Sequence, residues 1–264
     1  GRPLALGLAG GQGSGKSTVA RLLREALALD RDGPALHAVV LALDDFYRTR
    51  AERERLAETV APLLVTRGVP GTHAVELVGA TIAALLGGAE AVWPRFDKAS
   101  DDRLPSPHVH RDRDADVVVL EGWCVGARPQ APELLRDPVN DLERDEDPEG
   151  RWRGAVNEAL AGPYGDLFAR LDRLVFLAVP DLAAVVRWRG EQERDNVAGA
   201  RDPAAAPMGA AALARFVAHY ERISRCMLDD ARSGRLGADL VLHLDPRHRI
   251  EAWSVEDAGA PARP

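Results

Sequence analysis

A glycine-rich turn between two apolar segments constrains this chain more than any other feature. Residues 10–18 read Gly-Gly-Gln-Gly-Ser-Gly-Lys-Ser-Thr, which fits the Walker A pattern G-x-x-x-x-G-K-[ST]. Residues 4–9 are apolar and lead into glycines, as in a buried strand, and residues 17–29 carry apolar side chains at helical spacing. A strand, a glycine loop and a helix in this order are the context that a phosphate-binding loop requires.

The lysine of this turn is one of only two lysines, Lys16 and Lys98, among 34 Lys and Arg residues. A lysine is a compact point charge that can enter a narrow phosphate cradle, whereas arginine is a broad planar fork. We expect Lys16 to neutralise the β- and γ-phosphate oxygens of a nucleoside triphosphate and the Ser17 hydroxyl to bind Mg²⁺. The residues expected to bind the nucleotide are Gly11, Gly13, Ser14, Gly15, Lys16, Ser17 and Thr18.

The remaining pattern predicts an α/β fold, because short apolar segments alternate with segments of helical periodicity. Strands are expected at residues 4–9, 37–43, 116–120, 173–179 and 239–244, and helices at 17–29, 51–65, 74–86 and 182–194. Residues 97–116 and the acidic stretch 137–150 are expected to be irregular, the second as a solvated loop. We expect one P-loop NTPase domain over residues 1–264, a parallel sheet with helices on both faces and a helical lid at 182–207.

Composition excludes several classes of protein. A net charge of -7 argues against a general basic surface for nucleic acid. No apolar run approaches the roughly 20 residues that a membrane-spanning helix needs. Cys124 and Cys226 form no C-x-x-C or metal-ligand spacing, which fits two idle thiols in a reducing compartment. We therefore expect a cytoplasmic protein that acts on a small molecule.

Three carboxylates stand where predicted strands end. Asp44 and Asp45 follow the second strand and Glu121 follows the third, and ligands of open parallel sheets bind beyond the carboxyl ends of strands. A carboxylate at Asp44 can accept the proton of a hydroxyl that attacks the γ-phosphate. Glu121 is in Walker B position and would hold Mg²⁺ or its water. The alternative for each is a capping or loop carboxylate.

Two basic groups could meet the substrate or the phosphates. Arg95 and Lys98, in the segment Pro94-Arg95-Phe96-Asp97-Lys98, could hold an anionic group, and the alternative is a solvated basic pair. Arginines at 187, 189 and 194 precede the Pro/Ala-rich residues 201–207, which suits a lid that closes over phosphates. The alternative is a surface helix face whose arginines pair with glutamates 191 and 193. The His108-x-His110 pair is expected to be solvated rather than metal-bound.

In their order along the chain, these segments resemble the P-loop metabolite kinases, which include uridine kinase, phosphoribulokinase and bacterial pantothenate kinase. The likeness is greatest to the D-glycerate 3-kinase family and extends from about residue 4 to about residue 250. The segments that carry it are Leu43-Asp44-Asp45-Phe46-Tyr47, Arg67-Gly68-x-Pro70-Gly71-Thr72-His73, Pro94-Arg95-Phe96-Asp97-Lys98, Leu120-Glu121-Gly122-Trp123, Val139-Asn140-x-Leu142-Glu143, Trp188-Arg189 and Arg215-Phe216-Val217-x-His219-Tyr220.

The resemblance implies an ATP- and Mg²⁺-dependent kinase in which Asp44 is the catalytic base and Glu121 lies beside magnesium. Lys16 and a lid arginine such as Arg189 would stabilise the transferred phosphoryl group, and Ser17, Asp44 and Glu121 would hold the metal. The residues expected to bind the acceptor are Asp45, Tyr47, Arg67, His73, Arg95 and Lys98.

One position departs from the related kinases, which usually carry an acceptor-positioning aspartate after the histidine. This chain has Ala74 there. D-glycerate is the expected acceptor, and a nucleoside or a pantothenate-like compound stays open because of that departure. A nucleotide-dependent switch without an acceptor is the remaining alternative, although the chain lacks the N-K-x-D motif of switch GTPases.

Overall fold

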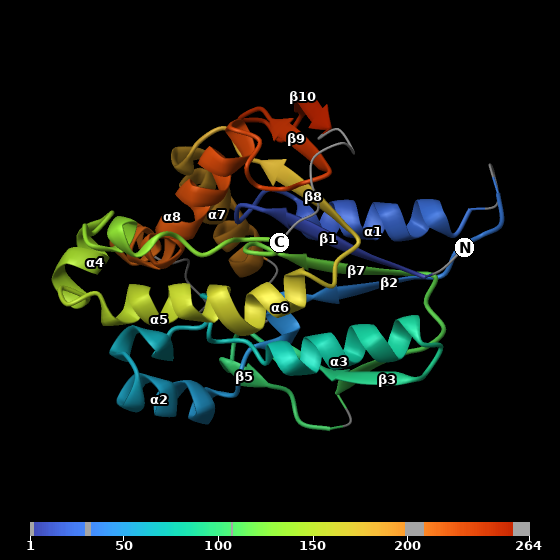
Figure 1. Ribbon diagram of the computed structural model, residues 1–264, viewed down its shortest axis with the longest axis horizontal. Helices are drawn as coiled ribbons and strands as arrows, with labels where there is room; N and C mark the ends of the chain where they lie inside the picture. Colours follow the sequence, from blue (N-terminus) through green and yellow to red (C-terminus); the bar gives the residue numbers. More distant parts are fainter. Residues whose placement is uncertain (1–2, 30–32, 107, 199–208, 256–264) are drawn as a thin grey trace.

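The computed structural model describes residues 3–29, 33–106, 108–198 and 209–255, without the side chains of residues 192–198. A six-stranded sheet forms its centre, in the order β10-β9-β8-β1-β7-β2 (Figure 1). Neighbouring strands are parallel except at the edge, where β10 runs antiparallel to β9. The strands are β1 (Leu4–Gly10), β2 (Ala38–Ala42), β7 (Val117–Gly122), β8 (Arg173–Ala178), β9 (Leu240–Leu244) and β10 (Ile250–Val255).

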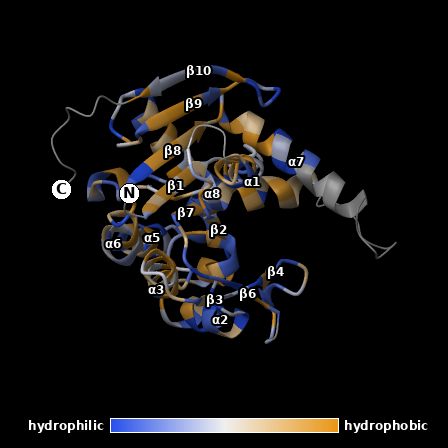
Figure 2. Ribbon diagram, turned by 90° about the vertical axis from the view of Figure 1, so that its right-hand side faces the viewer, coloured by the Kyte–Doolittle hydropathy of each residue, from blue (hydrophilic) through white to orange (hydrophobic). Residues whose placement is uncertain are grey.

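Helices cover both faces of this sheet, as Figure 2 shows. On one face lies α1 (Lys16–Leu27), and on the other lie α3 (Val75–Leu86), α5 (Arg151–Ala159), α6 (Gly165–Phe168) and α8 (Ala210–Arg232), whose Met227 lies beside Phe176 of β8. Helix α7 (Leu182–Ala198) packs against α8. Because helices cover both faces of the sheet, both faces of its central strands are buried, and these strands are continuous apolar segments in the sequence. Every residue of β7, for example, is buried. The predicted α/β fold with a mostly parallel sheet is confirmed, and each of the five predicted strands is present.

The sequence patterns missed several shorter elements. The segment expected to be irregular at 97–116 contains parts of two small antiparallel pairs, and the helix expected at 51–65 is divided after Thr59, shortly before Pro62. Proline lacks a backbone N–H and cannot continue the helical ladder. The shorter elements are η1 (Leu43–Phe46), α2 (Arg50–Thr59), η2 (Pro62–Val65), β3 (Ala91–Pro94), β4 (Phe96–Asp97), β5 (Asp102–Arg103), β6 (Val109–Asp112), η3 (Pro132–Leu135), α4 (Asp141–Glu146) and η4 (Leu160–Tyr164).

The prediction of a solvated loop at 137–150 was wrong. Its centre is α4, and Glu143 is fully buried, 2.6 Å from the guanidinium of Arg222 on α8. Asp147 is buried as well, 3.0 Å from Arg153. Acidic side chains are usually solvated, but these two have buried arginine partners, six residues away for Asp147 and 79 residues away for Glu143, which composition does not reveal.

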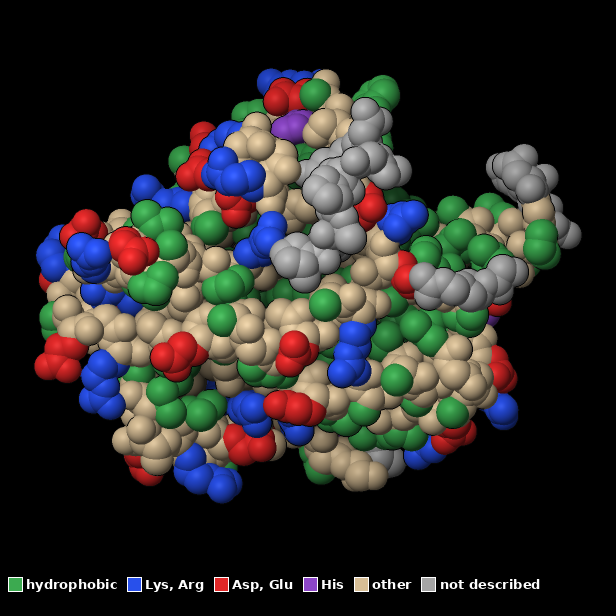
Figure 3. Space-filling model, in the orientation of Figure 1, with side chains coloured by type: hydrophobic (Ala, Val, Ile, Leu, Met, Phe, Trp, Pro, Cys, Tyr) green, Lys and Arg blue, Asp and Glu red, His purple; other side chains and the backbone are tan. Residues whose placement is uncertain are grey.

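Acidic and basic side chains are interspersed on the face seen in Figure 3. Among the described residues, no helix combines the length and apolar character needed to cross a membrane. Cys124 is buried and Cys226 partly buried, and both are free thiols.

Candidate active site

The phosphate loop joins β1 to α1 with the geometry that its glycines allow. Gly13 and Gly15 have φ angles of 76° and 86°, in the left-handed region that favours glycine. A Cβ on Gly13 would lie 2.6 Å from the Cβ of Trp188, so the loop also packs closely against α7. Gly15 caps α1 without any side-chain hydrogen bond, which leaves the first N–H groups of this helix to a ligand. Ser14 Oγ is buried without a hydrogen-bond partner among the described residues, which fits a site for phosphate oxygens.

Lys16 lies inside this loop, where its Nζ donates to the carbonyl of Gly11 at 3.0 Å. Burial lowers the pKa of Lys16, and the charges of Glu121 and Asp44 oppose that change. The lysine is therefore positioned between the phosphate loop and two carboxylates from neighbouring strands. Thr18, also expected at the nucleotide, is exposed on the first turn of α1.

Glu121, near the end of β7, meets the hydroxyl that follows the lysine. Ser17 Oγ donates to Glu121 Oε1 at 2.7 Å. Burial raises the pKa of Glu121, while Lys16 and the Ser17 hydrogen bond lower it. A hydroxyl beside a carboxylate is a suitable donor set for Mg²⁺, which usually takes one or two protein carboxylates and completes its shell with phosphates and water. The described residues include no cluster of three or more His, Cys, Asp or Glu side chains placed to hold a metal.

Asp44 lies in η1, directly after β2, and both of its oxygens are engaged. Tyr47 Oη donates to Oδ1 at 2.7 Å and Lys98 Nζ donates to Oδ2 at 2.6 Å. Burial would raise the pKa of Asp44, but the charge and hydrogen bond of Lys98, together with Tyr47, outweigh it and lower the pKa to about 2. The carboxylate is therefore ionised at neutral pH. The two lysines of the chain act on one region, Lys16 from the phosphate loop and Lys98 from the segment after β4.

Asp45, the neighbouring carboxylate, has different contacts. Its Oδ1 accepts from the backbone N–H of Phe96, and His110 Nε2 lies 3.1 Å from its Oδ2. His110 also stacks on Trp93 at 5.4 Å between ring centroids, so it is not the solvated residue that we expected, whereas His108 is exposed. These contacts give Asp45 a role in holding η1 against the β3–β6 hairpin, and its place in acceptor binding stays a prediction.

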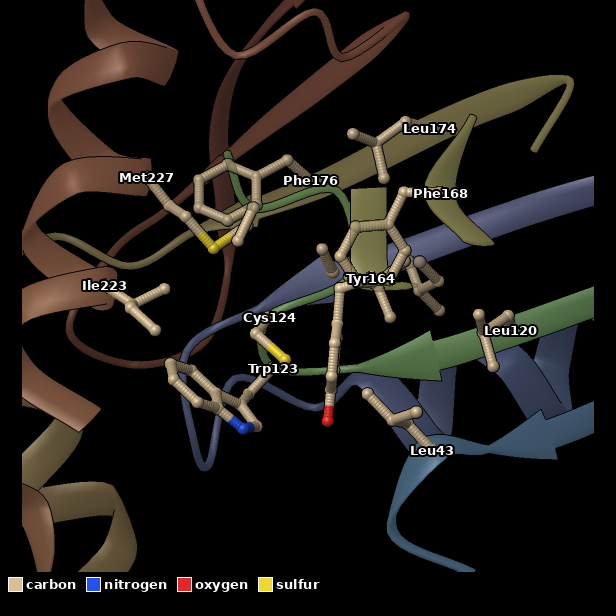
Figure 4. Close-up of a cluster of buried hydrophobic side chains, with 14 of the residues drawn as sticks. Leu43, Leu120, Trp123, Cys124, Tyr164, Phe168, Leu174, Phe176, Ile223 and Met227 are labelled. Carbon is tan, nitrogen blue, oxygen red and sulfur yellow. The ribbon is translucent and has the colours of Figure 1, made fainter. Parts of the chain in front are cut away.

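Segments that were separate motifs in the sequence meet at the loop of residues 67–73. Trp123 Nε1 donates to the carbonyl of Gly68 at 2.8 Å, and Tyr220 Oη donates to the carbonyl of Arg67 at 3.0 Å. Tyr164 Oη accepts the backbone N–H of Gly71 at 3.1 Å. Figure 4 shows the polar ends of Trp123 and Tyr164 on the same side of a buried cluster of apolar side chains. Three buried aromatic side chains, Trp123, Tyr164 and Tyr220, therefore hold this loop by hydrogen bonds to its backbone.

The same loop carries two of the expected acceptor residues. His73 is fully buried, and its ring stacks on Tyr47 at 4.6 Å between centroids. Arg67 forms an ion pair with Asp101, lies 5.5 Å from the ring centroid of Phe96 and donates to the carbonyl of Lys98. These contacts bring the loop against η1 and the β4–β5 turn. Arg95 is exposed in the same part of the chain.

The lid over residues 182–207 stays a prediction. Residues 182–198 form α7, but the segment 199–208, which includes most of the Pro/Ala stretch, lies outside the described residues, as does the side chain of Arg194. Arg187 is exposed and the guanidinium of Arg189 lies 5.0 Å from the ring centroid of Phe216. Trp188, between them, is buried and stacks on His248 at 3.9 Å, as expected for a packing residue.

Sequence reasoning missed Tyr164, which reaches the loop of residues 67–73 from η4. This π-helical turn contains Pro163 and a non-helical Gly162. The only sequence signal near Tyr164 is the order Gly-Pro-Tyr. It indicates an interrupted helix but does not predict the contact of Tyr164 with residues 67–73. Asp101, which pairs with both Arg53 and Arg67, gave no signal either, because its partners are distant in sequence.

Comparisons with known proteins bear on the fold and on the family of the chain. No protein-family model matches the chain. The YGR205w protein, of known structure, is 26% identical with a TM-score of 0.74, over 96% of this chain and 89% of that one. A D-glycerate 3-kinase from Cryptococcus neoformans has a TM-score of 0.78 over 97% of this chain and 90% of that one, and at 24% identity it shows a common fold.

The kinase mug58 of Schizosaccharomyces pombe, which is itself uncharacterized, is 35% identical over 209 residues, 73% of this chain and 71% of that protein. This chain also carries the phosphate loop and the strand-end carboxylates of a P-loop kinase. The chain therefore belongs to the family of P-loop kinases that includes mug58, and it is a phosphotransferase.

Proposed function

We propose that this enzyme transfers the γ-phosphoryl group of ATP, with Mg²⁺, to a hydroxyl of a small metabolite, and that the metabolite is D-glycerate and the product 3-phosphoglycerate. The observation that carries the proposal is the position of Asp44. It follows β2 at the same end of the sheet as the phosphate loop and Glu121, close enough for its charge to act on Lys16. A carboxylate beside the γ-phosphate position suits a hydroxyl acceptor.

In the proposed reaction the acceptor oxygen attacks the γ-phosphorus and its proton passes to a carboxylate oxygen of Asp44. A new oxygen–phosphorus bond forms, the bond from the γ-phosphorus to the β,γ-bridging oxygen breaks, and ADP leaves. Lys16 stabilises charge on the phosphate oxygens. Ser17 and Glu121, with Asp44 as a further carboxylate, would hold Mg²⁺, which neutralises the same charge. Closure of α7 would add Arg189.

The basic side chains beside Asp44 support an anionic acceptor. Lys98 contacts Asp44 directly, and Arg67 contacts the carbonyl of Lys98. A carboxylate of glycerate entering here would meet Lys98 and Arg95, and Tyr47 and His73 would lie beside the reacting hydroxyl. Since Ala74 replaces the aspartate usual in related kinases, a nucleoside or a pantothenate-like acceptor is the second candidate.

The test is an ADP-release assay with ATP and Mg²⁺ over a panel of small hydroxy acids, nucleosides, sugars and pantothenate. D-glycerate should give the highest kcat/KM and L-glycerate a lower one. Acceptor-dependent release with uridine or pantothenate and none with glycerate would contradict the choice of acceptor. Release that no acceptor increases above the water blank would contradict the proposed function as a whole.

A further inference from the structure

The hydroxyl of Tyr164 has a complete set of hydrogen bonds that fixes where its proton lies. It accepts the backbone N–H of Gly71 at 3.1 Å and the backbone N–H of His73 at 3.2 Å. A phenolic hydroxyl has two acceptor lone pairs and one proton, so these two bonds leave only the proton. The remaining contact, 2.6 Å to His73 Nδ1, must therefore be one in which Tyr164 donates. Burial raises the pKa of Tyr164 well above its usual value, so this proton is retained.

The tautomer of His73 follows from this arrangement. Nδ1 accepts a hydrogen bond and carries no proton, so the neutral ring has its proton on Nε2. Burial lowers the pKa of His73 to about 3, which keeps the ring neutral at physiological pH. His73 therefore offers one N–H donor, in a single tautomer, without a positive charge.

That donor is unused. His73 Nε2 is buried and has no hydrogen-bond partner among the residues that the structure describes. An unpaired buried donor is costly, and native proteins usually satisfy such groups. The ring stacks on Tyr47, whose hydroxyl binds Asp44, so the unused donor lies one side chain away from the proposed base.

A second buried histidine provides an internal contrast. The Nδ1 atom of His219 lies 2.9 Å from the carbonyl of Arg215, and a carbonyl can only accept. His219 therefore carries its proton on Nδ1, the opposite tautomer. Its ring lies edge-on to that of Trp152.

We propose that Tyr164 is a positioning residue that holds His73 as a neutral Nε2–H donor, and that this donor binds an oxygen of the phosphoryl acceptor. The inference rests on the proposed phosphoryl transfer. It requires that the acceptor place a hydroxyl or carboxylate oxygen, not an ammonium group, against His73 Nε2. Because Nε2 is buried, the site must open as the acceptor enters. Opening would break the contact between Asp44 and Lys98, whose side chain is 60% exposed.

The first test is nitrogen-15 NMR of histidine-labelled protein. Two-bond correlations between ring protons and nitrogens distinguish the tautomers, and His73→Asn and His219→Asn assign the signals. We expect His73 as the Nε2–H tautomer and His219 as the Nδ1–H tautomer, with the His73 Nε2 signal shifting when D-glycerate is added to saturation. An Nδ1–H tautomer for His73, or an Nε2 signal that saturating acceptor leaves unmoved, would overturn the inference.

The second test separates the donor from the fold. Asn offers an amide oxygen near the Nδ1 position and keeps the contact with Tyr164, whereas Gln offers an amide N–H near the Nε2 position. His73→Asn should raise KM for glycerate about 10- to 100-fold with KM for ATP unchanged, while His73→Gln should stay within about fivefold of wild type. Tyr164→Phe should raise the same KM and add the Nδ1–H tautomer to the His73 NMR signals. His219→Asn is the matched control and should change neither KM.

Failure of this inference and failure of the proposed function have different signatures. If wild type is active and His73→Asn and His73→Gln have the same KM for the acceptor, the donor role is refuted and the kinase assignment stands. If wild type shows no acceptor-dependent turnover, the proposed function is refuted, and with it the binding role of His73. The tautomer assignment is then decided separately by the NMR spectrum.

Discussion

Acidification should destabilise this protein through His73 more than through an ordinary surface histidine. The ring is fully buried, accepts from Tyr164, and has a pKa lowered from 6.5 to about 3 because burial disfavours its charged form. Between those two values the unfolded chain binds a proton that the folded chain does not bind. Protonation therefore favours unfolding, and the contribution of His73 to stability is complete above pH 6.5 and is lost as the pH falls towards 3.

The size of this effect follows from the linkage relation. Each pH unit well inside the window changes the free energy of unfolding by about 1.4 kcal/mol, so lowering the pH from 7 to 5 should cost about 2 kcal/mol through this residue alone. Replacing His73 with Asn removes the titration while keeping an acceptor for the Tyr164 hydroxyl. The variant starts less stable at pH 7, but its stability should fall by about 2 kcal/mol less than that of wild type over the same two pH units.

Urea unfolding at pH 7, 6 and 5, at constant ionic strength, measures this difference. The other titrating groups are shared by the two proteins and cancel when the two pH dependences are subtracted. Parallel curves would show that His73 protonates in the folded state near its ordinary pKa, which would refute the burial and tautomer argument together. A ring-proton NMR titration of native wild type provides an independent check, because the His73 signal should show no midpoint between pH 5 and 8.

Three further predictions concern the base, its lysine and a buried ion pair. Asp44→Asn should retain ATP binding by calorimetry and lose about 10²- to 10⁴-fold in kcat, and undiminished turnover would exclude Asp44 as the base. Lys98→Met should raise KM for glycerate about tenfold or more with little change in KM for ATP, whereas a change confined to ATP would move Lys98 to the nucleotide side. Arg222→Leu leaves Glu143 buried without its partner and should cost about 3–5 kcal/mol in urea unfolding. The pair of Arg225, which is 53% exposed, with Glu221 is the control, since Arg225→Ala should cost under about 1 kcal/mol, and similar losses in both variants would contradict the difference in burial of the two arginines.

Local patterns along the chain were enough to predict the framework of the site. The Walker A turn, the apolar strands and the carboxylates at their ends depend on neighbouring residues, so spacing alone places Lys16, Ser17, Asp44 and Glu121 at one end of a sheet. The structure brings these residues together: Ser17 contacts Glu121, and the charge of Asp44 acts on Lys16.

The contacts that organise the acceptor side join residues distant in sequence, and no local pattern contains them. Tyr164 reaches His73 across 91 positions, and Lys98 reaches Asp44 across 54. The burial of Glu143 in the acidic stretch could not be predicted for the same reason, because its ion-pair partner Arg222 lies 79 residues later in the chain. Composition describes a residue's own preference for water, whereas burial depends on the partner that the fold supplies.

The most direct test of the proposed reaction is phosphorus-31 NMR of the products formed from ATP, Mg²⁺ and D-glycerate. We expect a phosphomonoester on the 3-hydroxyl of glycerate, formed in equal amount to ADP by wild type and not detectably by Asp44→Asn over the same period. Inorganic phosphate as the only new phosphorus signal, or an ester formed equally well without Asp44, would contradict the account.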